Sequence, residues 1–569
     1  MSQTTDVVDA AVRDASAIHP APENGIAGLR HWRYDLLAGF VVSLVSLPLS
    51  SGIAIASGAP PIYGIISSII AGLIFPFIGG SFVTISGPAA GLAPALMATM
   101  VALGGAGDAD TVGAGYPMLL VVIFIAGAAQ VVMAKLGLAR FAAIFPASAV
   151  EGMLGAIGLL ILVKALPLFF GFLGTSHAHG FFEYVAEIPH WWHGSNPTAL
   201  GIGVVTLVIM LASASSFARQ LTVFAKVPPH LFGVLFAVPA AMALGLGDID
   251  PAFLIDVPDN PLEGLSLPDF GGLASRTDLW WAATVGVITL MLIDGVESLA
   301  TAAAIDRIDP FERRSQPDRV LLAMGLSNMV SSLVGGLTVI PGGVKSKTCI
   351  EAGGRTLWAN FVNACFLLAF LFLAPALVSM IPKAALGAIL VYTGWKMIHP
   401  SIVRSLAKVG PEQVVVYVLT IVAILLTDLL VGVLVGTAIK LAIVAIMRWR
   451  GDVDPAHADR SPAAVVRELF ADPVDEVEDT GEVHLLHVHH PVVSFNAYRL
   501  LERAKEERDK GYKVVIVVAS DSGLVDHTAM ETLHRVSHDI EGVTVQGLED
   551  LQPRTAHPMS VRTSKKEVA

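Results

Sequence analysis

Two short stretches place helix-breaking residues inside apolar sequence, where their backbone could bind a ligand. In TISGPAAGLA, Ser86, Gly87 and Pro88 precede a run of small residues. A proline in the first turn of a helix loses no helical hydrogen bond, and the free N–H groups of that turn, together with the helix dipole, attract an anion. The stretch therefore predicts a half-helix that begins at Pro88 and binds a small anion. The N–H groups that would face this anion are those of Ala89, Ala90 and Gly91.

The second stretch is GGLTVIPGGVKSKTCIEAGG, in which Pro341, Gly342 and Gly343 interrupt an apolar segment. Its break comes about 60 residues after Trp280, much as Ser86 comes about 50 residues into the first half, and paired breaks of this kind are typical of a transporter site. Packing glycines and ordinary kinks are the alternative. Two breaks at matching places favour two half-helix N-termini that face one anion.

A carboxylate lies in the apolar segment between these breaks. Glu297 sits in TLMLIDGVESLATAAAIDRIDP, and Asp294 and Thr301 fall one turn before and after it on the same face. Ionisable residues inside a membrane segment are costly and usually functional. Glu297 could carry a proton or hold Na⁺ beside the anion, so Na⁺ is the candidate coupling ion. The alternative is a buried, protonated structural glutamate.

The composition shows what must position these residues. The chain is 54% hydrophobic and 15% charged, and its apolar runs approach the roughly 20 residues that cross a bilayer. We predict a polytopic α-helical membrane protein with fourteen segments. They are Leu36–Ser57, Pro61–Gly79, Ser86–Leu103, Tyr116–Met133, Phe141–Leu166, Thr198–Ala214, Pro229–Leu246, Trp280–Ile305, Val320–Leu337, Pro341–Ile350, Trp358–Ser379, Ala385–Met397, Glu412–Asp428 and Leu430–Met447.

The positions of lysine and arginine predict the orientation. LGGAGDADTVGAG and GFLGTSHAHGFFEYVAEIPHWWHGSNP contain neither residue, whereas the alternate connections are rich in both. By the positive-inside rule, both termini are cytoplasmic and the chain is a multi-pass protein of the cell membrane. Lys164 is expected to extend to the external interface, and Lys345 and Lys347 either attract anions from the cytoplasmic side or only satisfy this rule.

The sequence becomes soluble in character after Arg450. GDVDPAHADRSPAA reads as a linker, and from about Gly481 strand and helix patterns alternate, which predicts a small, mainly parallel α/β domain. The predicted organisation is a cytoplasmic N-terminal tail (1–30), a transport domain (31–450), a linker (451–480) and the α/β domain (481–569).

These stretches together resemble the SulP family of inorganic anion transporters. The similarity is carried by SLPLSSGIAIASGAPPIYGIISSIIAGLIFPFIGGSFVTISGPAAG, FPASAVEGMLGAIG, GVESLATAAAIDRIDPFERRSQPDR and GGLTVIPGGVKSKTCIEAGGRTLWANF, and the tail resembles a STAS domain. The resemblance implies two inverted seven-span repeats, a core domain of spans 1–4 and 8–11, a gate domain of spans 5–7 and 12–14, and a homodimer.

The resemblance also implies a site between spans 3 and 10. Its anion-binding residues would be Ser86, Gly87, Pro88, Ala89, Ala90, Ile340, Pro341, Gly342 and Gly343, with Ser50 and Ser51 from span 1. Glu297, with Thr301 and Asp294, falls where the family has the acid linked to cation coupling. Two departures are the glycine-rich VIPGGVKSK and the motif VDHTA, in which His527 stands at the position phosphorylated in related soluble regulators.

The predicted function is secondary active transport of a small inorganic anion, of the bicarbonate or sulfate class, coupled to Na⁺ or H⁺. The scarcity of evident side-chain donors favours bicarbonate. Alternatives are an uncoupled anion exchanger or channel, a nucleobase carrier of the same fold, and a membrane-anchored STAS signalling or scaffold protein. The sequence shows no nucleophile–base set, phosphate-binding loop, nucleic-acid signature or zinc-ligand spacing, so we expect a transporter rather than an enzyme, and no metal other than Na⁺ near Glu297.

Overall fold

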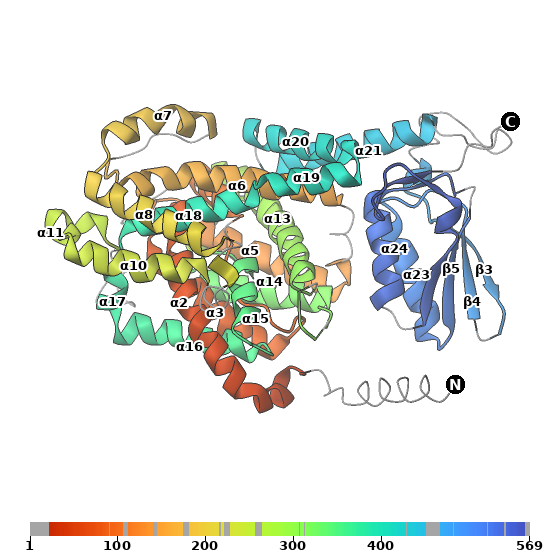
Figure 1. Cartoon of the computed structure of the whole chain (residues 1–569), viewed down its shortest axis with the longest axis horizontal. Helices are drawn as coiled ribbons and strands as arrows, with labels where there is room; N and C mark the ends of the chain where they lie inside the picture. Colours follow the sequence, from red (N-terminus) through yellow and green to blue (C-terminus); the bar gives the residue numbers. More distant parts are fainter. Residues whose placement is uncertain are drawn as a thin grey trace.

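A helical membrane domain and a smaller C-terminal α/β domain lie side by side in the computed structural model (Figure 1). The structure describes residues 22–89, 91–105, 112–139, 145–174, 181–215, 218–220, 228–255, 265–306, 308–311, 313–427, 429–450, 467–481, 483–519, 522–539 and 542–563. Most of the predicted tail and linker therefore lies outside the described residues, as does Ala90.

Each predicted membrane segment contains a helix. In the first half these are α2 (Trp32–Ala56), α3 (Pro61–Ile78), α4 (Ala93–Ala102), α5 (Tyr116–Lys135), α6 (Ala147–Phe170), α8 (Pro197–Ser213) and α10 (Pro229–Ala243). In the second half they are α13 (Trp280–Asp306), α14 (Pro317–Leu333), α15 (Gly343–Glu351), α16 (Trp358–Leu373) with α17 (Pro375–Ser379), α18 (Lys383–Met397), α20 (Pro411–Leu426) and α21 (Leu429–Arg450).

The lengths of these helices show a multi-pass membrane protein but leave the number of spans a prediction. Within the described ranges, six helices are long and apolar enough to cross a membrane, or seven if the bent pair α7 (Phe181–His193) and α8 counts as one span. Shorter apolar helices, such as α4 and α20, add to them.

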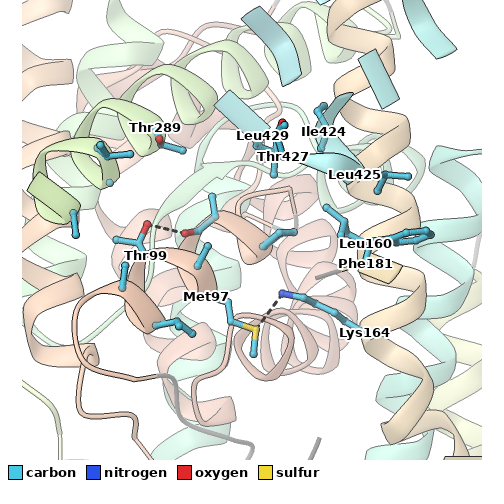
Figure 2. Close-up of a pocket in the computed structure, with 18 of the residues that line it drawn as sticks. Met97, Thr99, Leu160, Lys164, Phe181, Thr289, Ile424, Leu425, Thr427 and Leu429 are labelled. Carbon is cyan, nitrogen blue, oxygen red and sulfur yellow. Dashed lines mark hydrogen bonds between the residues drawn. The ribbon is translucent and has the colours of Figure 1, made fainter. Parts of the chain in front are cut away.

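The helices pack mainly within two groups. The core group comprises α2–α5 and α13–α16, in which α5 packs along α14 and α2 along α16; the gate group comprises α6, α8, α10, α18, α20 and α21, in which α6 packs along α18. Glycines allow this close approach: an added Cβ on Gly158 would meet the Gly394 carbonyl oxygen, and one on Gly394 would meet that of Gly158. A cavity of about 460 Å³ lies between the two groups (Figure 2).

The C-terminal domain has the predicted alternation of strands and helices. Its main sheet has the order β3-β4-β5-β7, in which β4 (Val483–Val488), β5 (Lys513–Val518) and β7 (Val543–Gln546) are parallel. Helices α23 (Ala497–Asp509) and α24 (His527–Asp539) connect them, and a small sheet holds β6 (Leu524–Val525), β8 (Gln552–Pro553) and β9 (Arg562–Thr563).

The first strand of this domain lies inside the predicted linker. Strand β3 (Val474–Asp479) pairs antiparallel with β4 at the edge of the sheet. Its sequence, VDEVED, is dominated by carboxylates, and all but its first residue are exposed. Charged residues are common on edge strands because they discourage pairing with other chains, so hydropathy gave no signal for this strand.

Helix α21 joins the two domains. Val444 of α21 packs into an apolar cluster with Leu469 and Phe495 of the C-terminal domain. Deeper in the interface, Lys440 Nζ lies 3.8 Å from Asp526 Oδ2, and both side chains are fully buried. Asp526 also caps α24 by accepting a hydrogen bond from the Ala529 N–H.

A second ionic contact lies at the rim of the same interface. Arg448 donates two hydrogen bonds to Glu468, at 3.1 and 3.0 Å. Partial burial raises the pKa of Glu468, but hydrogen bonds from His490 and Arg448 outweigh this and lower it to about 2. Glu468 is therefore ionised at neutral pH and holds the end of α21 to the C-terminal domain.

We expect Lys440→Met to loosen the docking of the C-terminal domain. Removing one partner of a buried ion pair leaves the other charge unpaired and costs about 3 kcal/mol, so hydrogen exchange in α24 and in the last turns of α21 should accelerate. Arg276→Ala is the control, because its pair with Asp278 is exposed and contributes less than about 1 kcal/mol. Equal exchange rates in the two variants would contradict this role of Lys440.

Candidate functional site

The two helix interruptions meet in the interior of the core group. Strand β1 (Ser86–Pro88) pairs antiparallel with β2 (Val339–Pro341), with Gly87 opposite Ile340. All six residues are buried. The pairing brings together the two stretches that the sequence pointed to, more than 250 residues apart in the chain.

Pro88 and Pro341 do not begin helices, which corrects the prediction for both. They lie in the two strands, and the helices start later, α4 at Ala93 and α15 at Gly343. The reason is the need to pair backbone groups at membrane depth. Strand pairing, and the 2.8 Å hydrogen bond from the Gly342 N–H to the Ile85 carbonyl, satisfy groups that two bare helix starts would leave open.

Polar side chains from neighbouring helices pair further N–H groups around the two strands. The Ile85 N–H donates to Ser346 Oγ of α15 at 2.9 Å, and the Val339 N–H donates to Asn328 Oδ1 of α14 at 2.6 Å. Two more such bonds join Ser86 to Asn360 of α16 and Leu337 to Ser67 of α3. The strand pair is therefore held from four helices of the core group.

Lys345 brings a positive charge to this strand pair. It lies in the first turn of α15, is 2% exposed, and donates hydrogen bonds from Nζ to Ser50 Oγ (2.9 Å) and Ser68 Oγ (3.0 Å). An added Cβ on Gly87 would overlap the Lys345 ammonium, so the absence of a side chain there lets the ammonium approach β1. Within the described part of the chain this ammonium forms no ion pair.

Glu297 faces the start of α4 from α13. Its carboxylate lies against Gly91, where an added Cβ would overlap both carboxylate oxygens. Glu297 Oε2 is buried without a hydrogen-bond partner among the described residues. One turn on, the Thr301 methyl group lies 3.7 Å from the position of a Cβ on Gly343. Glu297 thus lies beside the start of α4, and Thr301 lies beside the start of α15.

Asp294 and Ser51 make other contacts. Asp294 Oδ2 accepts hydrogen bonds from Gln130 Nε2 (2.8 Å) and Asn328 Nδ2 (2.6 Å). Since Asn328 also holds Val339, Asp294 supports β2 through a chain of hydrogen bonds. The Ser51 hydroxyl donates to the Leu47 carbonyl of its own helix. Of the two serines predicted from span 1, the structure brings the hydroxyl of Ser50 to Lys345.

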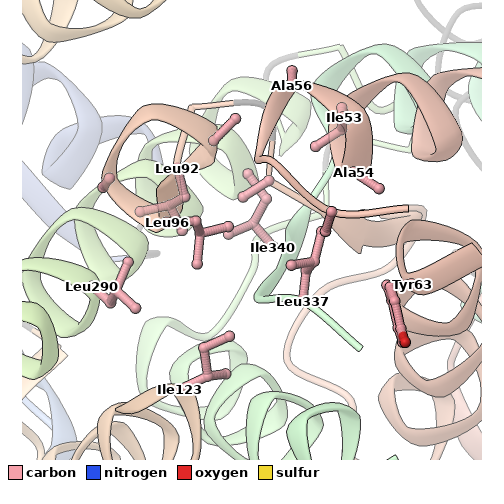
Figure 3. Packing of buried hydrophobic residues seen from close by; sticks show 14 of the residues in the cluster. Ile53, Ala54, Ala56, Tyr63, Leu92, Leu96, Ile123, Leu290, Leu337 and Ile340 are labelled. Atoms are coloured by element: carbon pink, nitrogen blue, oxygen red, sulfur yellow. The ribbon is translucent and has the colours of Figure 1, made fainter. Parts of the chain in front are cut away.

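The remaining predicted residues line the strands or lie at their ends. Ala89 is buried directly after β1. The Ile340 side chain lies beside Leu96 of α4 and Leu92, the residue before this helix, in the main apolar cluster (Figure 3), so it fixes α4 against β2. Gly342 and Gly343 form the N-terminus of α15.

The sequence grouped Lys345 with the cytoplasmic lysines. The reason is that a lysine at the start of a broken helix has the same charge signal as a lysine in a cytoplasmic loop. The neighbouring residue shows the difference: the Lys347 side chain is 52% exposed and lies 4.0 Å from Glu351. The signal that could have separated them is the spacing from Gly342 and Gly343, which puts Lys345 in the first turn of the half-helix.

The contact between Gly91 and Glu297 gives a direct test of this geometry. We expect Gly91→Ala to lower the free energy of unfolding by about 1–3 kcal/mol through overpacking, and the loss should disappear when Glu297→Ala removes the carboxylate. Gly201→Ala in α8 is the control, because its Cβ would meet nothing within 4 Å. If Gly91→Ala still lowers the free energy of unfolding when it is added to the Glu297→Ala variant, the contact is contradicted.

Comparison with known proteins agrees with this architecture. A model of the sulfate permease family matches residues 32–420. The putative sulfate transporter YvdB of Bacillus subtilis is 25% identical over 444 residues, 77% of this chain and 78% of that protein. The bicarbonate transporter BicA of Picosynechococcus sp. is 24% identical over 410 residues, 72% of this chain and 69% of that protein.

A solved structure shows the same fold over both domains. The murine Solute Carrier 26 family member A9 anion transporter, in the inward-facing state, superposes with a TM-score of 0.61 at 18% identity, covering 90% of this chain and 84% of that one. This coverage extends beyond the membrane domain, and the C-terminal α/β domain is consistent with a STAS domain. From the match of the family model to most of its length, the chain belongs to the sulfate permease family.

Proposed function

We propose that this protein is a secondary active transporter of a small inorganic anion of the bicarbonate or sulfate class. The observation that carries the proposal is the Lys345 ammonium, held by Ser50 and Ser68 against the glycine of a paired strand break. Two of the relatives are a putative sulfate transporter and a bicarbonate transporter, which supports the substrate class.

The charges around the strand pair support coupling to Na⁺ or H⁺. A buried charge inside a membrane protein is costly unless it is paired. An anion beside Lys345 would offset its positive charge, and a cation or a proton on Glu297 would offset the carboxylate that faces Gly91. Loading both partners together leaves each of these two buried charges paired while the core group moves against the gate group.

Side-chain donors do not decide between the two anions. Lys345, Ser50 and Ser68 supply an ammonium and two hydroxyls, so the scarcity of such donors no longer favours bicarbonate. Either anion fits this chemistry, because both accept hydrogen bonds from ammonium and hydroxyl groups. Labelled uptake of bicarbonate, sulfate and chloride into proteoliposomes, under imposed Na⁺ and H⁺ gradients, identifies the substrate.

The contacts of the C-terminal domain support the proposed orientation. The Ala147 N–H at the start of α6 donates to Thr528 Oγ1, and Met447 near the end of α21 accepts from Arg554. If this domain is cytoplasmic, both helix ends are too, as the distribution of lysine and arginine predicts. A homodimer in the cell membrane stays a prediction from the resemblance, and native mass spectrometry tests it.

We expect Lys345→Gln to reduce anion uptake at least about tenfold, because a neutral amide replaces a charge-assisted donor. Lys347→Gln, two residues away on an exposed side chain, should retain uptake near that of the unchanged protein. Initial rates in proteoliposomes, normalised to inserted protein, measure both. Equal uptake by the two variants would remove Lys345 from the site.

We expect Glu297→Gln to abolish uptake driven by a cation gradient while anion exchange without a gradient continues. Glutamine has nearly the same shape but neither takes up a proton nor attracts Na⁺ as a carboxylate does. The comparison of gradient-driven uptake with exchange in one preparation controls for folding. Gradient-driven uptake that survives in this variant would contradict a role of Glu297 in coupling, whereas the absence of any gradient-driven uptake in the unchanged protein would favour the uncoupled exchanger.

A further inference from the structure

The cavity between the core and gate groups is separate from the strand pair. Its walls come from α4 and α13 of the core group and from α6, α20 and α21 of the gate group, with Phe181 of α7 at its edge (Figure 2). On α4 it is lined from Pro94 onward, beyond the helix start that faces Glu297. A small solute leaving the site along α4 on this side would enter the cavity.

The cavity lies toward the membrane face opposite the C-terminal domain. Helix α6 begins at Ala147, which contacts that domain, and the cavity is lined by Leu160 and Lys164 in its second half. Helix α21 ends against the same domain, and the cavity is lined by its first residue, Leu429. Both gate helices therefore contribute their ends farther from the C-terminal domain.

Among the described residues that line this wall, Lys164 is the one basic side chain, and the others are mostly apolar with a few threonines. Its ammonium lies 3.1 Å from the Met97 sulfur (Figure 2). It also lies 5.7 Å from the centre of the Tyr184 ring. A thioether is a weak acceptor, and an aromatic face offsets only part of a cation's charge. Among the described residues the ammonium has no carboxylate partner.

The contact with Met97 also spans the two groups, since Met97 belongs to α4 and Lys164 to α6. The side chain is half-buried rather than extended into lipid. A cation that only anchored α6 at the membrane surface would point outward along the helix to the headgroups. Lys164 points instead across the cavity toward the core group, where a passing anion would meet it.

We propose that Lys164 forms a second, transient anion station in this cavity, on the face opposite the C-terminal domain. The inference rests on the proposed transport function and adds a station to its path. The occupant is a small inorganic anion, because one ammonium in an apolar wall offers charge without the several directed donors that a larger organic anion needs. The positive charge raises the local anion concentration and speeds binding at the strand pair from that side.

A thiol-labelling experiment tests the local charge without needing transport. Ala98 lines the cavity next to Met97 and is exposed, so Ala98→Cys introduces a reactive thiol there in a Cys365→Ser background. We expect the ratio of labelling rates for an anionic and a cationic methanethiosulfonate to fall about tenfold with Lys164→Met. Lys164→Arg is the control and should keep the ratio.

Uptake measurements test the role in transport. With substrate applied to the face opposite the C-terminal domain at low ionic strength, we expect Lys164→Met to raise KM severalfold and leave kcat unchanged, whereas Lys164→Arg keeps both. An unchanged labelling ratio, or a changed ratio with an unchanged KM, overturns the station. If the unchanged protein takes up none of bicarbonate, sulfate or chloride, the proposed function itself fails, and the labelling result shows separately whether the cavity is electropositive.

Discussion

The pairing of two broken membrane segments is the constraint on which the site depends. Backbone N–H and C=O groups inside a membrane must find partners within the protein, and each break creates several unpaired groups. Here the breaks satisfy one another as β1 and β2, and side chains such as Asn328 and Ser346 complete the pairing. The site therefore requires both halves of the chain, because neither strand has its partner without the other.

This pairing determines where charge can lie. Gly87 and Gly91 leave no side chain between the backbone and its neighbours, so Lys345 approaches one strand and Glu297 approaches the start of α4. The two side chains come from different helices, α15 and α13, and carry opposite charges. A site with one positively and one negatively charged side chain suits an anion and a cation that bind together. A site made of backbone N–H groups alone would suit a single anion.

The sequence predicted the helices well and the site in outline. Apolar length and Gly/Pro boundaries placed elements such as Pro61–Ile78 and Tyr116–Lys135 nearly to the residue, because membrane helices are long and their signal is strong. The sequence predicted that the two breaks lie close together, but not that they pair as strands with Pro88 opposite Val339. A strand of three residues is too short to show a periodicity. The role of Asn328 in holding β2 depends on a tertiary contact that local sequence does not encode.

Helix α21 gives the C-terminal domain a mechanical connection to the cavity. Its first residue, Leu429, lines the cavity, and its last turns are fastened to the domain by Lys440, Val444 and Arg448. A helix of 22 residues is a stiff rod about 33 Å long. A small tilt of the C-terminal domain would move the other end of α21, where Leu429 lines the cavity. A ligand or protein that binds this domain can therefore widen or narrow the cavity without contacting the membrane domain.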